Sequence, residues 1–154
     1  MGLHGKLVTQ ISIKVDGDLF FHLFKHKLHH ITNICPQKIQ SVNLISGQWG
    51  TVGSVISWNY IKDGASFTAK EIIEAVDEEK RSITYKVIEG DLMAYYNIFK
   101  LTFSVDSNGE LDNVVRWSLE YEKKNESVPE PWTFLDFCVT ATKEIERHYM
   151  LVPN

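Results

Sequence analysis

Four of the six histidines fall within nine residues, in the stretch HLFKHKLHH. On one continuous helix these four imidazoles would share a face, because residues at i, i+4, i+7 and i+8 lie along one side. Such a row would suit a transition metal, and histidine side chains also exchange protons near neutral pH. The stretch therefore raises three hypotheses: a metal site, a proton-transfer site or a solvated surface. The four residues are His22, His26, His29 and His30.

A glycine-rich segment, GQWGTVGSV, places glycines at positions 47, 50 and 53. Its amide groups could cradle an anion, as nests of successive backbone N–H groups do. The segment differs from a phosphate-binding loop because no lysine follows Gly53. It also lies between two predicted strands, where no helix N-terminus meets the anion. We therefore predict a structural loop here, and no nucleotide site.

The two cysteines, Cys35 and Cys138, are far apart in the sequence. Their number and spacing imply no disulfide framework. We expect two reduced, mostly buried thiols, which are typical of a cytosolic protein. No serine, histidine and aspartate are spaced in a way that indicates an activated nucleophile.

The elements that would position these residues follow from hydrophobic periodicity. Alternating apolar and polar residues predict seven strands, and short turn-like links join most of them into an antiparallel meander. Apolar residues at helical spacing predict two short helices, the second ending before Pro36, and one long amphipathic helix. The predicted strands span residues 6–15, 38–47, 54–62, 66–77, 82–90, 95–105 and 114–123, and the helices span 19–26, 28–34 and 133–151.

Length and composition fit a single domain over residues 1–154. Hydrophobic residues make up 44% of the chain, enough for a sizeable core or a lined cavity. The net charge of −4 argues against nucleic acid as a partner. No apolar run approaches the ~20 residues of a membrane span, and the start of the chain has no apolar segment of signal-peptide length. We expect a cytoplasmic protein, and leave open whether it is a monomer or a weak dimer.

Three segments carry a resemblance to a known family: GQWGTVGSV, then KVIEGD at residues 86–91, then YEK followed by PEPWTFLDFC. With the order of the predicted elements, they resemble the plant major latex protein family of the birch-pollen-allergen and pathogenesis-related superfamily. The resemblance runs from about Lys6 to Tyr149. It implies an α+β helix-grip fold, in which a curved seven-stranded antiparallel sheet wraps around the long C-terminal helix. Two short helices form a V, and a large, mostly apolar cavity is enclosed.

The resemblance also implies a function. Relatives bind hormones, flavonoids, sterols, fatty acids and other amphipathic molecules in the cavity, and some superfamily members cyclise or isomerise alkaloid and terpenoid intermediates. We therefore expect a carrier or sensor of a small hydrophobic or amphipathic plant metabolite, acting in defence, stress or specialised metabolism without a cofactor. The alternative is a cofactor-free cyclase or isomerase, because catalysis by proximity and desolvation leaves almost no motif in a sequence.

Strand alternation, with its phase fixed by the family pattern, assigns the side chains that face the long helix. Together with residues of the three helices they form the predicted ligand-binding set, which is apolar with a few polar tips. Tyr60, Tyr85, Tyr121 and Asn97 are the tips expected to orient a ligand. The predicted set consists of Leu23, Leu28, Ile31, Trp58, Tyr60, Ala69, Ile73, Ile83, Tyr85, Asn97, Phe99, Leu101, Trp117, Leu119, Leu135, Cys138 and Thr142.

Four side chains are candidates for acid–base chemistry. Glu71 falls on the inner phase of its strand, where a carboxylate must be either paired or poised with a raised pKa. Tyr85 could donate a proton to a bound substrate. His26 and His30 could lie at the cavity mouth, since the V-helices frame the entrance in the superfamily. The family pattern breaks the helix near residues 25–27, which divides the histidines between two arms, so we predict no metal site.

Overall fold

Seven antiparallel strands form one sheet in the computed structural model, which describes residues 3–107 and 113–151. Their order across the sheet is β1-β7-β6-β5-β4-β3-β2. The strands β2 to β7 follow one another as a meander, while β1 lies beside β7 with His4 opposite Glu122. The strands are β1 (His4–Ile13), β2 (Ile39–Ser46), β3 (Val55–Lys62), β4 (Ala65–Asp77), β5 (Ser82–Gly90), β6 (Tyr96–Ser107) and β7 (Asn113–Lys123).

The helices are α1 (Gly17–His26), η1 (Leu28–His30), α2 (Ile31–Ile34), η2 (Asp91–Ala94) and α3 (Trp132–Leu151). Asp16 caps α1 by accepting a hydrogen bond from the backbone N–H of Asp18 at 3.0 Å. Helix α1 ends at Lys27, whose φ of −127° and ψ of 33° are not helical. The predicted break between the two short helices is therefore confirmed. The four histidines do not lie on one continuous helix.

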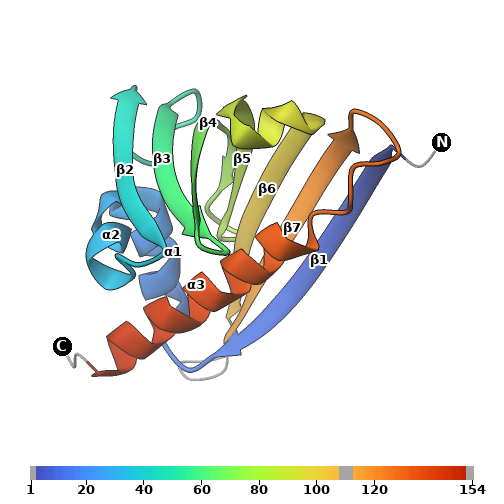
Figure 1. Cartoon of the computed structure of the whole chain (residues 1–154). Coiled ribbons are helices and arrows are strands. Elements are labelled where there is room, and N and C mark those ends of the chain that lie inside the picture. The colour runs from blue at the N-terminus through green and yellow to red at the C-terminus, as the bar shows by residue number, and fades with distance from the viewer. Residues whose placement is uncertain (1–2, 108–112, 152–154) are drawn as a thin grey trace.

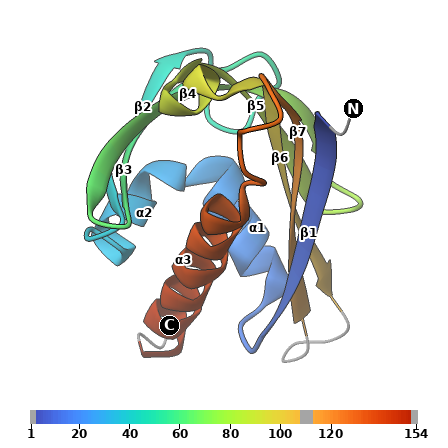
Figure 2. The same cartoon turned by 45° about the vertical axis from the view of Figure 1, so that its right-hand side comes forward.

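The sheet curves over α3, which crosses its concave side (Figure 1). Figure 2 shows α1 and α2 on this same side, next to the C-terminal half of α3. Stacking of Phe24 on Phe103, with ring centroids 4.1 Å apart, joins α1 to β6. On α3, the buried residues Phe134, Cys138 and Ile145 recur at helical spacing and face the sheet. The predicted helix-grip architecture is confirmed.

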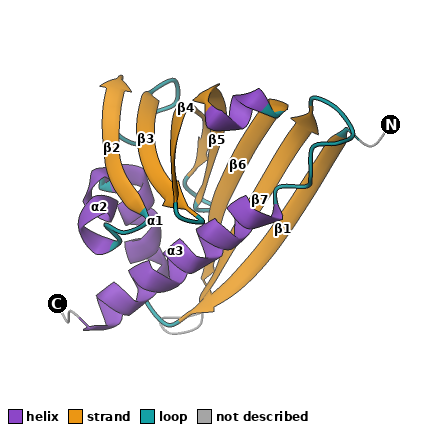
Figure 3. Cartoon of the chain, viewed as in Figure 1, coloured by secondary structure: helices purple, strands orange, loops and turns teal. Residues whose placement is uncertain are grey.

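Most predicted elements lie within two or three residues of their observed bounds (Figure 3). One difference is the link between the predicted strands 82–90 and 95–105, expected as a short turn, where the chain forms the one-turn helix η2. The predicted link at residues 106–113 lies largely outside the described residues. No helix within the described ranges is long and apolar enough to span a bilayer.

Gly90, in the VIEGD segment, sits where the chain leaves β5. Its φ is +122°, and a Cβ atom there would lie 2.3 Å from the carbonyl oxygen of Thr68. The next residue, Asp91, accepts a hydrogen bond from the Thr68 N–H at 2.7 Å. Gly90 therefore lets the chain approach β4 closely, which any side chain would prevent.

Replacing Gly90 with alanine is expected to lower the free energy of unfolding by about 2–4 kcal/mol, because backbone strain adds to a backbone clash. Gly64→Ala is the matched control, since Gly64 also has a positive φ, +80°, but no atom lies within 4 Å of the added Cβ. Urea denaturation followed by circular dichroism measures both. Equal losses for the two variants would show that the contact with Thr68 is unimportant.

Candidate ligand-binding site

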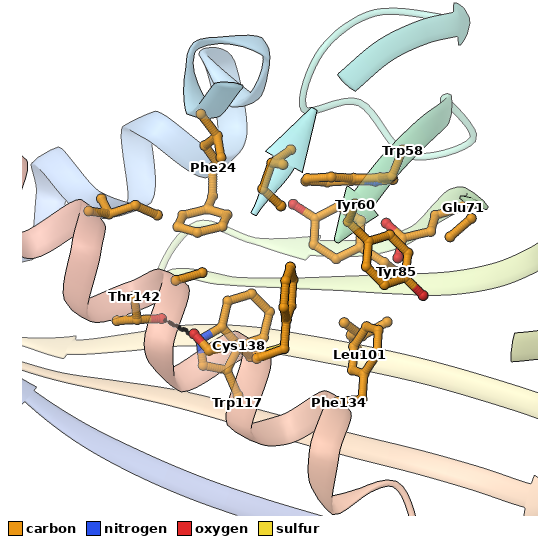
Figure 4. A pocket seen from close by; sticks show the side chains of 16 residues that line it. Phe24, Trp58, Tyr60, Glu71, Tyr85, Leu101, Trp117, Phe134, Cys138 and Thr142 are labelled. Atoms are coloured by element: carbon orange, nitrogen blue, oxygen red, sulfur yellow. Dashed lines mark hydrogen bonds between the residues drawn. The ribbon is translucent and has the colours of Figure 1, made fainter. Parts of the chain in front are cut away.

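A cavity of about 80 Å³ lies between the concave face of the sheet and α3. Its wall is almost entirely apolar and combines strands β2 to β7 with residues from α1, α2 and α3 (Figure 4). The lining residues are Phe24, Ile31, Ile39, Trp58, Tyr60, Ala69, Glu71, Tyr85, Leu101, Trp117, Phe134, Phe137, Cys138, Ala141, Thr142 and Ile145.

The cavity is much smaller than the resemblance implies, because aromatic side chains occupy the space between sheet and helix. Ligand pockets usually measure about 300–1,000 Å³. Here the Tyr60 ring packs against Phe134 and Phe137 of α3, with centroids 6.1 and 5.5 Å away. Tyr60 and Phe134 also line a second pocket, of about 180 Å³, on the other side of these rings. The aromatic group thus divides two spaces that would otherwise join.

Glu71 places a carboxyl group in the cavity wall, on the interior strand β4, and is only 6% exposed. No lysine, arginine or histidine in the described part of the chain lies within ion-pair distance of it. Burial raises the pKa of Glu71 from 4.5 to about 7, and the indole N–H of Trp58 lowers it in part. At neutral pH both forms are populated, so the group can donate or accept a hydrogen bond.

Two further polar atoms beside Glu71 are buried without partners among the described residues. They are the hydroxyl of Tyr85 and the Nε1 of Trp58. The Trp58 N–H affects the pKa of Glu71, but it does not make a hydrogen bond of normal geometry. Burial, and then the charge of Glu71, raises the pKa of Tyr85, so its hydroxyl stays protonated. Figure 4 shows Glu71, Tyr85, Tyr60 and Trp58 at the same end of the cavity.

The opposite end of the cavity has its polar groups satisfied. The Nε1 of Trp117 donates to the hydroxyl of Thr142 at 2.9 Å, and that hydroxyl donates to the Cys138 carbonyl at 2.8 Å (Figure 4). Burial raises the pKa of the Cys138 thiol, which keeps it in its unreactive protonated form. The two unpartnered polar atoms of the cavity wall, the Tyr85 hydroxyl and the Trp58 Nε1, therefore lie at the Glu71 end. An unpaired buried polar group costs about 1–3 kcal/mol, so a ligand that pairs with these groups gains affinity.

The structure divides the predicted ligand-binding set in two. One part lines the cavity: Ile31, Trp58, Tyr60, Ala69, Tyr85, Leu101, Trp117, Cys138 and Thr142. The other part is buried in the surrounding core without lining it: Leu23, Leu28, Ile73, Ile83, Phe99, Leu119 and Leu135. The face of the strand or helix on which a residue lies cannot separate these two parts, because both parts face inward.

The prediction for Asn97 is wrong. Its side chain is exposed, while Tyr96 and Phe99 on either side of it are buried. The pairing of β6 with β7 shifts between Tyr96 and Ile98, which marks a β-bulge. A bulge inserts one extra residue and reverses the alternation before it. Tyr121 is buried, yet its hydroxyl donates to Glu130 outside the cavity lining.

The geometry does not support the catalytic hypothesis for His26 and His30. Both side chains are exposed, and neither lines the cavity. His30 instead lines a separate groove at the surface. No three His, Cys, Asp or Glu side chains among the described residues are arranged to hold a metal ion.

Sequence reasoning missed six lining residues: Phe24, Ile39, Phe134, Phe137, Ala141 and Ile145. Phe134, Ala141 and Ile145 lie on the apolar stripe of the long helix, so a helical-wheel argument could have found them. Phe24 and Ile39 gave no such signal, because their positions depend on how α1 and β2 dock.

The glycine-rich loop joins β2 to β3 and is structural, as predicted. Its amides bond to the protein: the N–H of Gly53 donates to the Ile73 carbonyl at 2.9 Å, and the N–H of Ser54 donates to Thr51. Trp49 stacks on His29 with centroids 4.9 Å apart, which fixes the loop against the V-helices.

A model of the pathogenesis-related protein Bet v 1 family matches residues 2–151 of the chain. The chain belongs to the Bet v 1 family. Among Bet v 1 proteins it is similar to the major latex group, being 48% identical to MLP-like protein 31 of Arabidopsis thaliana over 96% of this chain and 87% of that protein. It is also 48% identical to MLP-like protein 28 of the same plant, but spans only 44% of that protein's length.

Solved structures of Bet v 1 proteins also superpose on this chain. Ginseng major latex-like protein 151, from Panax ginseng, superposes with a TM-score of 0.93 at 49% identity, over 96% of this chain and 99% of that one. Norcoclaurine synthase from Thalictrum flavum superposes with a TM-score of 0.76 over 98% of this chain and 89% of that one, but at 19% identity. This second similarity shows a shared fold alone.

Proposed function

We propose that this Bet v 1 protein binds a small, mostly apolar plant metabolite between the sheet and α3, as a cytoplasmic carrier or sensor. The observation that carries the proposal is an apolar cavity whose wall holds the buried carboxyl group of Glu71 beside two polar atoms without partners, the Tyr85 hydroxyl and the Trp58 Nε1. In a ligand with an apolar body and one polar group, the polar group would hydrogen-bond with these atoms and the apolar body would fill the cavity. Hormone, terpenoid and flavonoid skeletons meet this description.

The size of the cavity restricts the ligand. A molecule of one or two rings needs only small rotations of Tyr60 and Phe134, which separate the cavity from the second pocket. A sterol or a long fatty acid requires those rings to swing away and the two spaces to join. The small ligands are therefore the favoured class.

Native mass spectrometry tests the proposal. Protein purified from plant tissue is expected to carry a retained molecule that denaturation releases, and recombinant protein incubated with 2-naphthol is expected to form a 1:1 adduct. Tyr85→Phe is expected to weaken 2-naphthol binding about 3- to 10-fold, the effect of losing one hydrogen bond. Bare protein in both experiments contradicts the proposal.

One observation favours an enzyme on the same cavity: a buried carboxyl group, that of Glu71, with a pKa of about 7 beside the Tyr85 hydroxyl. A group that titrates near the working pH suits proton transfer to or from a bound intermediate. In this second candidate function, Glu71 would move the proton and the aromatic walls would hold the substrate folded during cyclisation or isomerisation.

Product analysis separates the two candidates. A carrier returns its ligand unchanged, whereas an enzyme alters the product ratio in a coupled assay with the reactive intermediate. Glu71→Gln abolishes that alteration if Glu71 moves the proton. An effect of Glu71→Gln on affinity alone sinks the catalytic candidate and leaves the carrier.

A further inference from the structure

A second concavity lies outside the central cavity, where α1, η1 and α2 meet the C-terminal end of α3. It measures about 310 Å³ and shares no lining residue with the central cavity. Four of its lining side chains are basic: His22, Lys27, His30 and His148. We call it the histidine groove. It contains part of the histidine-rich stretch, for which the proposed function gives no role.

The histidine groove is amphipathic. Its apolar side includes Leu23, which is 1% exposed, together with the half-buried Ile34 and Tyr149. Its volume reaches the range of small-molecule sites, which begins at about 300 Å³. An apolar surface next to a row of nitrogen donors complements a molecule with a hydrocarbon part and an anionic head.

The four basic side chains of the groove are not neutralised within the described residues. No carboxylate lines the groove, and the side chains of Lys27, His22, His30 and His148 make no ion pair or hydrogen bond there. The acidic residues nearby in sequence already have partners: Asp18 pairs with Arg81, Glu144 pairs with Lys38 at 3.1 Å, and Glu146 accepts a hydrogen bond from the Lys14 N–H at 2.7 Å.

The pKa values of two neighbouring imidazoles, His26 and His29, indicate that the local electrostatic potential is positive. Partial burial and then the positive charges of His22 and Lys25 lower the pKa of His26, although Glu78 opposes them. Partial burial and then the charges of His30 and Lys27 lower the pKa of His29. Cations therefore repel each other on this face, and an anion placed there relieves the repulsion.

We propose that the histidine groove binds an amphipathic anion, with a sulfate, phosphate or carboxylate head among its basic side chains and an alkyl chain along its apolar side. The ligand is a single dissolved molecule, because the site is a concavity framed by the four helical segments α1, η1, α2 and α3. This inference is independent of the proposed function of the central cavity.

Proton uptake strengthens the site in acid. Imidazoles as a class gain charge as the pH falls from 7.5 to 5.5. His22 comes from α1, His30 from η1 and His148 from α3, so imidazoles face the groove from three elements. The acids nearby in sequence are engaged elsewhere: Asp18 with Arg81, Glu144 with Lys38, and Glu146 with Lys143 and the Lys14 N–H.

Octyl sulfate below its micelle concentration is the probe, because its head stays charged at every pH used. Titration calorimetry at pH 5.5 and 7.5 is expected to show binding about tenfold tighter at pH 5.5. Histidine ring signals in ¹H–¹³C spectra locate the ligand: those of His22, His30 and His148 should shift, while that of His4, which lies on β1, should not.

Control experiments test separately the charged head of the ligand, its alkyl chain and the location of the binding site. Octyl glucoside and inorganic sulfate should each bind at least about tenfold more weakly than octyl sulfate, because each lacks one half of the ligand. The triple substitution His22→Gln/His30→Gln/His148→Gln should remove the pH dependence, whereas His4→Gln should preserve it. The inference is overturned if octyl glucoside binds as well as octyl sulfate, or if the ring signals of the groove histidines do not shift. Phosphatidylglycerol vesicles are a further probe, and binding to these vesicles alone would also overturn it.

Discussion

Replacing Glu71 with glutamine is expected to stabilise the protein at pH 8 by about 2–3 kcal/mol, and to change little at pH 4.5. In the folded protein the pKa of Glu71 is raised from 4.5 to about 7, so the folded state binds this proton more tightly than the unfolded state. Stability is therefore lost as the pH rises from about 4.5 to 7. Glutamine carries no charge and avoids this loss.

Urea denaturation of both proteins at pH 4.5, 6 and 8 measures the difference in the free energy of unfolding. Glu79→Gln is the matched control, since Glu79 is exposed in the turn between β4 and β5. That variant should change stability by less than about 0.5 kcal/mol at each pH. A stabilisation by Glu71→Gln that does not vary with pH would mean that the carboxyl group is not desolvated.

Ala141→Trp is expected to weaken binding of 2-naphthol at least about 100-fold while the protein stays folded. Ala141 lines the central cavity from α3, and an indole ring there occupies space that is only about 80 Å³. Overpacking of this kind costs about 1–3 kcal/mol of stability, which a domain of this size can tolerate. Calorimetry measures the affinity, and circular dichroism monitors folding.

Thr140→Trp is the control for Ala141→Trp, because Thr140 lies on the exposed side of the same helix. Its affinity for 2-naphthol should match that of the unmodified protein within about twofold, since surface substitutions rarely disturb a distant site. Undiminished binding to Ala141→Trp would place the ligand outside the cavity. That result would contradict the proposed function.

The sequence predicted the elements well because their signals are local. Alternation along β5 puts Ile83, Tyr85 and Val87 on one face, and all three are buried. Asn97 shows the limit of this reasoning, because a bulge depends on how β6 pairs with a strand that follows it in the sequence. A single inserted residue changes the face of every residue on one side of it.

The candidate site was harder to predict than the core around it. Ile83 and Tyr85 share a strand face, but only Tyr85 borders the cavity. Which inward side chain borders an empty space depends on how closely sheet and helix pack, to within the width of a methyl group. Glu71 was the exception, since a carboxylate between the inward-facing Ala69 and Ile73 is conspicuous in the predicted register.

The pairing of β1 with β7 has a consequence for biosynthesis. His4, near the beginning of the chain, is bonded in register with Glu122, and α3 then packs on β1, where the Lys14 N–H donates to Glu146 at 2.7 Å. On the ribosome, β1 is made first but must wait without its partner until β7 has emerged. Contacts so distant in sequence slow folding and leave an unpaired edge available to other chains. A newly made chain therefore exposes the unpaired edge of β1 until β7 has emerged.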